Sequence, residues 1–206
     1  ERGGLEAETL VTADRDRLLV AIHKFTYGPK IESIVTCRFC AEPFDLDFSL
    51  DDLQTYLHGE PSGADAERLE DGTYLLPSGC RFRLPTGEDE LAVAGYPAQQ
   101  AAEMLLQRCV LEGDPAEHGE QVQQAMAQLA PVLQTEMSAV CPECGKEQQV
   151  RFDIQSFLLN RLKNERRQTS WEIHRLAATY QWSHQEILNL PRSLRRLYVS
   201  YIESEG

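Results

Sequence analysis

Residues 35–53 read VTCRFCAEPFDLDFSLDDL, and residues 140–159 read VCPECGKEQQVRFDIQSFLL. Each stretch contains a C-x-x-C pair, and the second pair, Cys141 with Cys144, follows the first, Cys37 with Cys40, at an offset of 104 residues. At this offset four apolar positions also coincide, namely Leu46 with Val150, Phe48 with Phe152, Leu50 with Ile154 and Leu53 with Phe157. We therefore interpret the two stretches as an internal repeat.

An alternating pattern follows each cysteine pair. Phe44, Leu46, Phe48 and Leu50 are separated by single residues, and the second stretch repeats this spacing. A period of two predicts a half-buried strand. The segments ESIVT (32–36) and MSAV (137–140) precede the pairs and are the predicted partner strands. Each half is therefore expected to be a β-hairpin that carries a cysteine knuckle near its turn.

The cysteine spacing is typical of a metal site. Two intervening residues allow a tight turn to direct both sulfurs at one ion, and structural zinc takes four ligands, with sulfur at about 2.3 Å. We expect Cys37, Cys40, Cys141 and Cys144 to share one structural Zn²⁺ per chain, as a split four-cysteine zinc ribbon. Gly145 follows the second pair where such a turn often needs a positive φ, whereas the first copy departs from this with Ala41, which is expected to strain or reshape its turn.

A redox-active pair and a catalytic zinc site are two other uses of paired cysteines. A thioredoxin-like C-x-x-C opens a helix after a strand, but strand-like alternation follows both pairs in this chain. A catalytic zinc keeps one position for water and commonly recruits His or a carboxylate. The histidines, by contrast, are scattered and are predicted to be surface or boundary residues: His23, His58, His118, His174 and His184. Cys80 and Cys109 are expected to be small buried apolar residues, with a disulfide between them as the alternative.

The whole pattern predicts an α+β fold, a zinc ribbon with a helical insertion and a C-terminal helical cap. Residues 1–57 are assigned to an N-terminal helix, the first knuckle hairpin and a short helix. Residues 58–136 are assigned to an inserted hairpin and helices, residues 137–160 to the second knuckle hairpin and residues 161–206 to a C-terminal helical unit. All four parts are expected to form one zinc-stapled domain.

Several local signals lie outside the knuckles. A helix over 14–25 is expected to bury an apolar stripe of Leu18, Leu19, Ile22 and Phe25. Residues 58–67 read as a polar loop, residues 73–90 as a hairpin around a Pro-Ser-Gly turn, and residues 97–111 and 120–129 as helices.

The C-terminal third predicts three packed helices. Thr169 with Glu172 and Ser183 with Glu186 have the spacing of capping boxes, so each pair is expected to begin a helix. A last helix is expected after Pro191, with its arginines in water. Aromatic and arginine side chains here are candidates for a protein interface, with core anchoring of the tryptophans as the alternative: Trp171, Trp182, Arg192, Arg195, Arg196 and Tyr198.

Charge and motifs limit the function classes. The formal net charge of −13 disfavours a general binder of nucleic acid or of anionic membranes, although residues 160–202 carry eight basic against three acidic side chains. The chain has no run of the roughly 18–20 apolar residues that span a bilayer and no charged-then-apolar leader. It also lacks a nucleophile elbow, a P-loop and a dinucleotide glycine pattern, so we expect no enzymatic activity and no small-molecule substrate.

Four segments carry a resemblance to a known family. They are IHKFTYGPKIESIVTCRFCAEPFDLDFSL, YLLPSGCRFRLPTGEDE, CPECGKEQQVRFDIQSFL and EIHRLAATYQWSHQEILNLPRSLRRLYVSYI. The resemblance covers nearly the whole chain from about Ala13. The chain resembles a baseplate protein family of T-even-type bacteriophage contractile tails, which is similar to components of bacterial contractile injection systems. The resemblance implies a non-catalytic structural or assembly subunit that contacts other baseplate, hub or spike subunits. It also implies a cytoplasmic location during assembly and later a place in a virion or injection particle.

Binding of nucleic acid is a second class of function for such a fold. Zinc ribbons also occur in nucleic-acid-binding proteins, and fold alone does not fix function. The knuckle loops have mixed charge, with Arg38 and Lys146 against Glu42 and Glu143, so only the basic C-terminal third offers a contact to nucleic acid. The structural subunit is therefore the leading hypothesis, and the nucleic-acid-binding zinc ribbon is the alternative.

Overall fold

A computed structural model describes residues 6–58 and 65–204 of the chain, without the side chain of His58. Most of the predicted polar loop, residues 59–64, lies outside the described residues. The chain divides into two compact units, Glu1–Gln155 and Ser156–Gly206, here called the N-terminal and C-terminal units. The fold mixes helices and sheets, as predicted.

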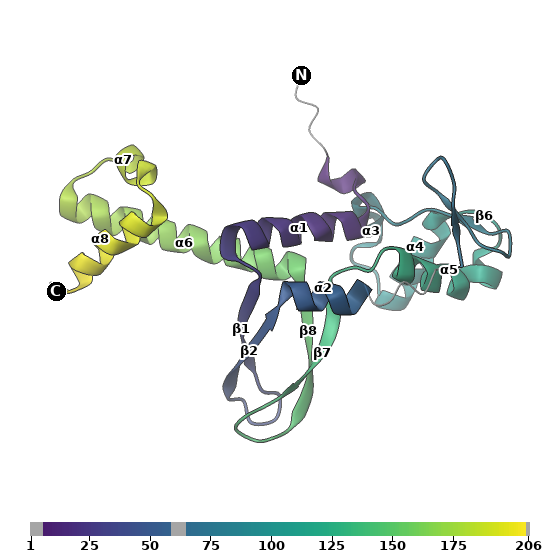
Figure 1. The fold of residues 1–206 in the computed structure, drawn as a ribbon, viewed down its shortest axis with the longest axis horizontal. Helices are drawn as coiled ribbons and strands as arrows, with labels where there is room; N and C mark the ends of the chain where they lie inside the picture. The colour runs from purple at the N-terminus through teal and green to yellow at the C-terminus, as the bar shows by residue number, and fades with distance from the viewer. Residues whose placement is uncertain (1–5, 59–64, 205–206) are drawn as a thin grey trace. The chain divides into compact units, whose positions relative to one another are not determined.

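The internal repeat is present as two matching hairpins in the N-terminal unit. In the first half, β1 (Lys30–Thr36) pairs antiparallel with β2 (Pro43–Ser49), and helix α2 (Leu50–His58) follows directly. In the second half, β7 (Gln134–Val140) pairs with β8 (Glu147–Asp153), and α6 (Ile154–Tyr180) follows directly. Every strand boundary is shifted by the predicted 104 residues. The two hairpins lie side by side with their turns at the same end (Figure 1).

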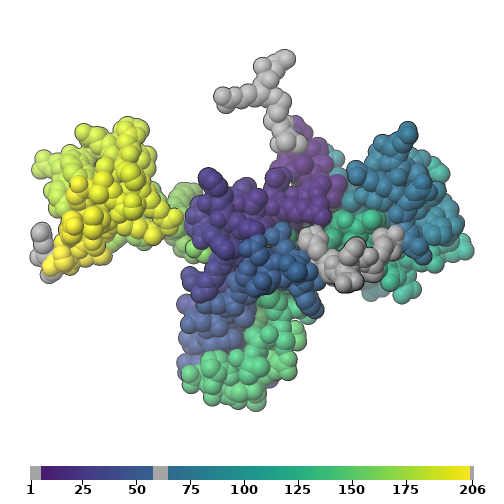
Figure 2. All heavy atoms as spheres, viewed as in Figure 1, coloured from purple at the N-terminus to yellow at the C-terminus, as the bar shows by residue number. Residues whose placement is uncertain are grey.

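The same backbone bond closes both halves. The N–H of Leu50 donates to the carbonyl of Pro29 at 2.9 Å, and the N–H of Ile154 donates to the carbonyl of Leu133 at 3.3 Å. Leu50 and Ile154 are both fully buried at the point where strand changes to helix. Figure 2 shows the atoms of the first hairpin and α2, in blue, packed against those of the second hairpin, in green. The matching positions therefore close each half by an equivalent backbone contact.

A short 3₁₀ turn, η1 (Ala7–Thr9), and helix α1 (Thr12–Tyr27) precede the first hairpin. The predicted apolar stripe of α1 is wrong, because Leu18 and Ile22 are about half exposed and Phe25 is 94% exposed. The helix instead buries Ala13, Asp16, Val20 and His23. Polar bonds fix this orientation: the Asp16 carboxylate accepts from the N–H of Leu133 at 2.9 Å, and His23 Nδ1 lies 3.1 Å from the carbonyl oxygen of Gly28.

The prediction of a surface or boundary position is therefore also wrong for His23, which is fully buried. His118 is half-buried on α5 (Pro115–Leu129), while His174 and His184 are exposed, as predicted.

The insertion between the two halves forms its own sheet and core. Strands β3 (Glu67–Arg68), β4 (Tyr74–Leu75), β5 (Arg81–Phe82) and β6 (Val110–Glu112) make an antiparallel sheet in that order. Helices α3 (Gly87–Val93), α4 (Ala98–Cys109) and α5 complete the insertion. The hairpin around residues 77–79 is confirmed, but the helix predicted over 97–111 ends at Cys109, because the next residues join the sheet as β6.

The core of the insertion contains Leu76, Cys80, Phe82, Val122 and Ala125. Cys80 and Cys109 are buried and free, as predicted, rather than bridged to each other. Burial raises the pKa of both thiols, that of Cys109 to about 11. Both side chains therefore stay protonated near neutral pH and behave as small apolar groups.

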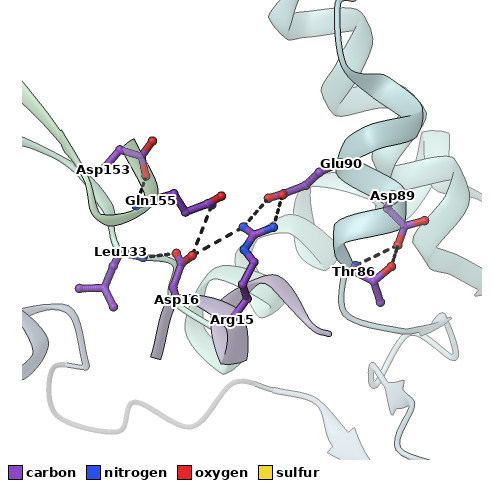
Figure 3. A network of polar contacts seen from close by, with 8 residues as sticks. All are labelled: Arg15, Asp16, Thr86, Asp89, Glu90, Leu133, Asp153 and Gln155. Carbon is purple, nitrogen blue, oxygen red and sulfur yellow. Dashed lines mark hydrogen bonds and ion pairs between the residues drawn. The ribbon is translucent and has the colours of Figure 1, made fainter. Parts of the chain in front are cut away.

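A polar network links α1 to the insertion and to the second half of the repeat (Figure 3). Arg15 on α1 pairs with the Glu90 carboxylate on α3 at 2.5 Å, and Gln155 donates to Asp16 at 3.4 Å. Burial raises the pKa of Asp16, although the N–H of Leu133 opposes this shift. One helix thus contacts, through adjacent residues, segments that are far apart in the sequence.

The C-terminal unit is built from the continuation of α6, from α7 (His184–Asn189) and from α8 (Arg192–Ser204). Leu176, Ile187 and Val199 form its buried core. The capping box of Ser183 with Glu186 is confirmed at the start of α7. The helix start predicted at Thr169 is wrong, because α6 runs through that position without a break. Glu172 does not cap a helix there; its buried carboxylate accepts from Arg195 Nε at 3.2 Å instead.

Candidate metal centre

The four predicted cysteines meet between the turns of the two hairpins. Their sulfur atoms all lie within 4.8 Å of one another, and the pairs Cys37–Cys144 and Cys40–Cys141 are each 3.7 Å apart. A tetrahedral ion with sulfur at about 2.3 Å requires sulfur-to-sulfur separations of about 3.8 Å. A disulfide would need about 2.05 Å, and all four cysteines are free. The spacing therefore fits four thiolates around one ion.

The two knuckles have the same backbone. The carbonyl of Cys37 accepts from the N–H of Ala41 at 3.0 Å, and the carbonyl of Cys141 accepts from the N–H of Gly145 at 2.9 Å. Ala41 has a φ of 63° and Gly145 a φ of 68°, so both occupy the left-handed region. Of the two expected outcomes for Ala41, a reshaped turn is wrong, and a strained residue is what the structure has. Alanine keeps the glycine geometry at a conformational cost of about 1–2 kcal/mol.

The site is divided equally between the halves. Under the 104-residue shift Cys37 corresponds to Cys141 and Cys40 to Cys144, so both of the 3.7 Å pairs cross from one half to the other. Cys37 and Cys141 are buried, whereas Cys40 and Cys144 are half-buried. Valine and alanine side chains of the hairpins pack around the cysteines. One knuckle alone supplies only two ligands, so a closed site requires both halves.

One contact breaks the equivalence of the halves, and the sequence motifs did not reveal it. The side-chain oxygen of Gln148, on β8, accepts from the N–H of Arg38 in the first knuckle at 2.8 Å. Gln148 is buried, and the corresponding residue of the first half is the buried Phe44. The signal in the sequence is Gln148 itself, a polar residue at a position where the alternation predicts an apolar one. Gln148 thus ties the first knuckle to the second hairpin.

Backbone donors favour the thiolate state at Cys37. The N–H groups of Cys40 and Phe39 lower the pKa of Cys37 to about 6, and Phe39 N lies 3.4 Å from that sulfur. The N–H of Glu42 lowers the pKa of Cys40, but burial and the hydrogen bonds shared with the other three sulfurs outweigh it and raise the value to about 12. Metal binding requires deprotonated cysteines, and a cation is what allows four adjacent sulfurs to be deprotonated together.

The predicted interface residues all belong to the C-terminal unit. Trp182 stacks on Tyr180 with ring centroids 4.8 Å apart and meets Tyr198 edge to face at 5.2 Å. Trp171 is 39% exposed, at the border between core and surface. Whether this surface binds a partner stays a prediction.

The arginines of α8 form ion pairs with α6. Arg192 pairs with Glu165, and Arg196 Nε lies 3.4 Å from the Glu172 carboxylate. The prediction that all three arginines stay in water is wrong for Arg195, whose side chain is only 12% exposed because it pairs with the buried Glu172.

Comparison with protein-family models, with curated proteins and with solved structures found no match to this chain. Among the described helices, none combines the length and apolar character that crossing a bilayer would need.

Proposed function

We propose that this chain is a non-catalytic structural or assembly subunit of a contractile phage-tail-like particle, held in shape by one zinc ion. The observation that carries the proposal is the meeting of four sulfurs, all within 4.8 Å, from two knuckles 104 residues apart. Four thiolates with no histidine or carboxylate among them are typical of closed structural sites, which keep no position for a reacting water. This arrangement supports a zinc-ribbon architecture with one knuckle from each hairpin.

The metal would close a very long loop. Everything from β2 to β7, including the whole insertion, lies between the two knuckles. Closing a loop of this length costs chain entropy, and structural zinc contributes about 10 kcal/mol or more of apparent binding free energy in small metal-dependent domains. The ion would therefore fix the two knuckles at one place, as a rigid part of a larger assembly requires.

The particle is proposed from the sequence resemblance, and the surface features are compatible with it. The partners would be other baseplate, hub or spike subunits. Nucleic acid is the weaker alternative, because three of the eight basic side chains that made it plausible, the α8 arginines, are paired with Glu165 and Glu172 on α6. An arginine that is already paired with a carboxylate of its own chain displaces fewer counterions from a phosphate backbone, so it contributes less to binding.

Two experiments test the two parts of the proposal separately. Native mass spectrometry with elemental analysis of protein purified without chelator should find one zinc per chain; iron in its place would change the metal, and no metal would overturn the site. Affinity purification of the tagged chain from its native host should recover baseplate, hub or spike proteins. Trp171→Ala should reduce this recovery, with exposed Gln185→Ala as the control. Recovery of nucleic acid without particle proteins would favour the alternative function.

A further inference from the structure

A groove of about 580 Å³ runs along the face where the first hairpin and α2 meet the second hairpin. One wall comes from β2 and α2, and the other comes from β7. It is lined by Asp47, Phe48, Ser49, Asp52, Leu53 and Tyr56 on the first wall and by residues 135–138 on the second. All of these residues belong to the N-terminal unit, and none of them is a proposed metal ligand.

The β7 wall is an unpaired strand edge. In the described part of the chain β7 pairs only with β8, and β2 only with β1, so each strand has one edge without a partner strand. Successive side chains of a strand point to opposite faces, so four consecutive residues can border one groove only if the strand presents its edge to it. Four consecutive β7 residues, 135–138, do so. An open edge of this kind is a template for another strand.

The groove combines an apolar floor with free negative charge. Phe48 contacts Phe152 edge to face at 4.9 Å, and Leu53 is buried beside it, while Tyr56 is 79% exposed at the rim. Asp52 and Glu136 are both exposed, and in the part of the chain that the structure describes neither forms an ion pair, whereas Asp47 pairs with Lys30 at 2.9 Å. Two carboxylates at a groove with an apolar floor favour a ligand that alternates basic and apolar side chains.

We propose that this groove binds an extended basic segment of a neighbouring protein, which adds to β7 as an extra strand. Backbone hydrogen bonds to the β7 edge would give affinity, lysine or arginine side chains would meet Asp52 and Glu136, and the intervening apolar side chains would cover Phe48. The first 155 residues of the chain carry 12 basic against 28 acidic side chains, so the same face of a second copy would be repelled. The inference does not depend on the particle role, because the free edge and the carboxylates exist in the isolated chain.

A charge-swap experiment on the full-length, metal-loaded protein tests the proposal. The probe is a short fluorescent peptide of alternating lysine and valine, compared by anisotropy with the same peptide carrying glutamate in place of lysine. The lysine peptide should bind and weaken with salt, and the glutamate peptide should not bind. Asp52→Lys combined with Glu136→Lys should lower affinity for the lysine peptide roughly tenfold or more, since close opposite charges become repulsive. Glu103→Lys with Glu120→Lys makes the same charge change on exposed helix positions and should leave binding nearly unchanged.

A second probe tests the strand-addition geometry. Methylation of alternate backbone nitrogens of the lysine peptide keeps its side chains but removes the hydrogen bonds of one edge, so binding should be lost. The proposal would be overturned if the methylated peptide bound as tightly as the unmethylated one. It would also be overturned if the Asp52/Glu136 and Glu103/Glu120 variants lost the same amount of affinity for the lysine peptide. Self-association of the unliganded protein that disappears in the Asp52/Glu136 variant would overturn it too, because the occupant would then be a second copy.

Discussion

The two halves of the repeat reach the same backbone with different residues. The first knuckle turns at Ala41 and the second at Gly145, yet both turns have φ values near 65° and the same closing hydrogen bond. Behind the knuckles, buried Phe44 corresponds to buried Gln148, and the nine-residue α2 corresponds to the first turns of the 27-residue α6. The shared feature is the position of the sulfurs. The position of the sulfurs is thus kept although the residue at the turn differs.

The largest effect should come from the ligands, and it should be equal in the two halves. Cys37→Ser and Cys144→Ser each remove one of four sulfurs, so both should lose the metal and destabilise the whole N-terminal unit. The expected loss of about 10 kcal/mol is comparable to the full stability of a domain. Thermal unfolding with metal analysis measures this. Cys109→Ala changes a buried thiol outside the site and should keep the metal. A serine variant that unfolds like the wild type would contradict the shared site.

The sequence predicted those features that are repeated in it. The 104-residue offset, the meeting of the four cysteines and both hairpins follow from residues whose spacing recurs, and the hairpin of the insertion follows from the turn residues 77–79. Strands β3 and β6 were not predicted, because two or three residues are too few to show a period.

The errors arose where tertiary contacts override local pattern. The buried face of α1 is set by Asp16 and His23, which hydrogen-bond to backbone groups, so counting apolar residues selected the wrong face. Thr169 and Glu172 have capping spacing, but Glu172 is held by arginines of α8 that are 23 and 24 residues later. Polar pairing across the fold leaves no local signature in the sequence.

The next effect should come from Gln148, a residue of the second half whose counterpart in the first half is apolar. Gln148→Ala removes the acceptor of the part-buried Arg38 N–H, and the loss of one such hydrogen bond costs about 1 kcal/mol. Chemical denaturation of the metal-loaded protein should show a loss of this size, while the exposed neighbour, in Gln149→Ala, should change little. If both variants unfold at the same denaturant concentration as the wild type, Gln148 does not stabilise the first knuckle.

Exchanging the turn residues compares the two knuckles directly. Ala41→Gly should stabilise the protein by about 1 kcal/mol, because glycine adopts a positive φ without steric cost, and Gly145→Ala should destabilise it by a similar amount. Nothing lies within 4 Å of a Cβ placed on Gly145, so the cost is conformational rather than a clash. The double exchange should return the free energy of unfolding to near the wild-type value. Unequal single effects would show that the two turns differ in their surroundings and not only in the residue.

The smallest effect concerns the helices that precede the two hairpins. Asp16 on α1 is buried, and at the 104-residue offset Glu120 on α5 is exposed. Burial raises the pKa of Asp16 above its unfolded value, so its protonated form is favoured in the fold. Its contribution to stability is therefore complete below the unfolded pKa and is lost as pH rises through the folded pKa.

Asp16→Asn keeps an oxygen that can accept from the N–H of Leu133, but the amide cannot titrate. The increase in the free energy of unfolding that Asp16 contributes as pH falls should therefore disappear, while the fold persists. Unfolding free energies measured across the acidic range should show this change of slope for Asp16→Asn. An unchanged slope in Asp16→Asn would mean that the carboxylate is hydrated in the folded chain. The polar network at the end of α1 would then owe its stability to the Arg15–Glu90 pair rather than to Asp16.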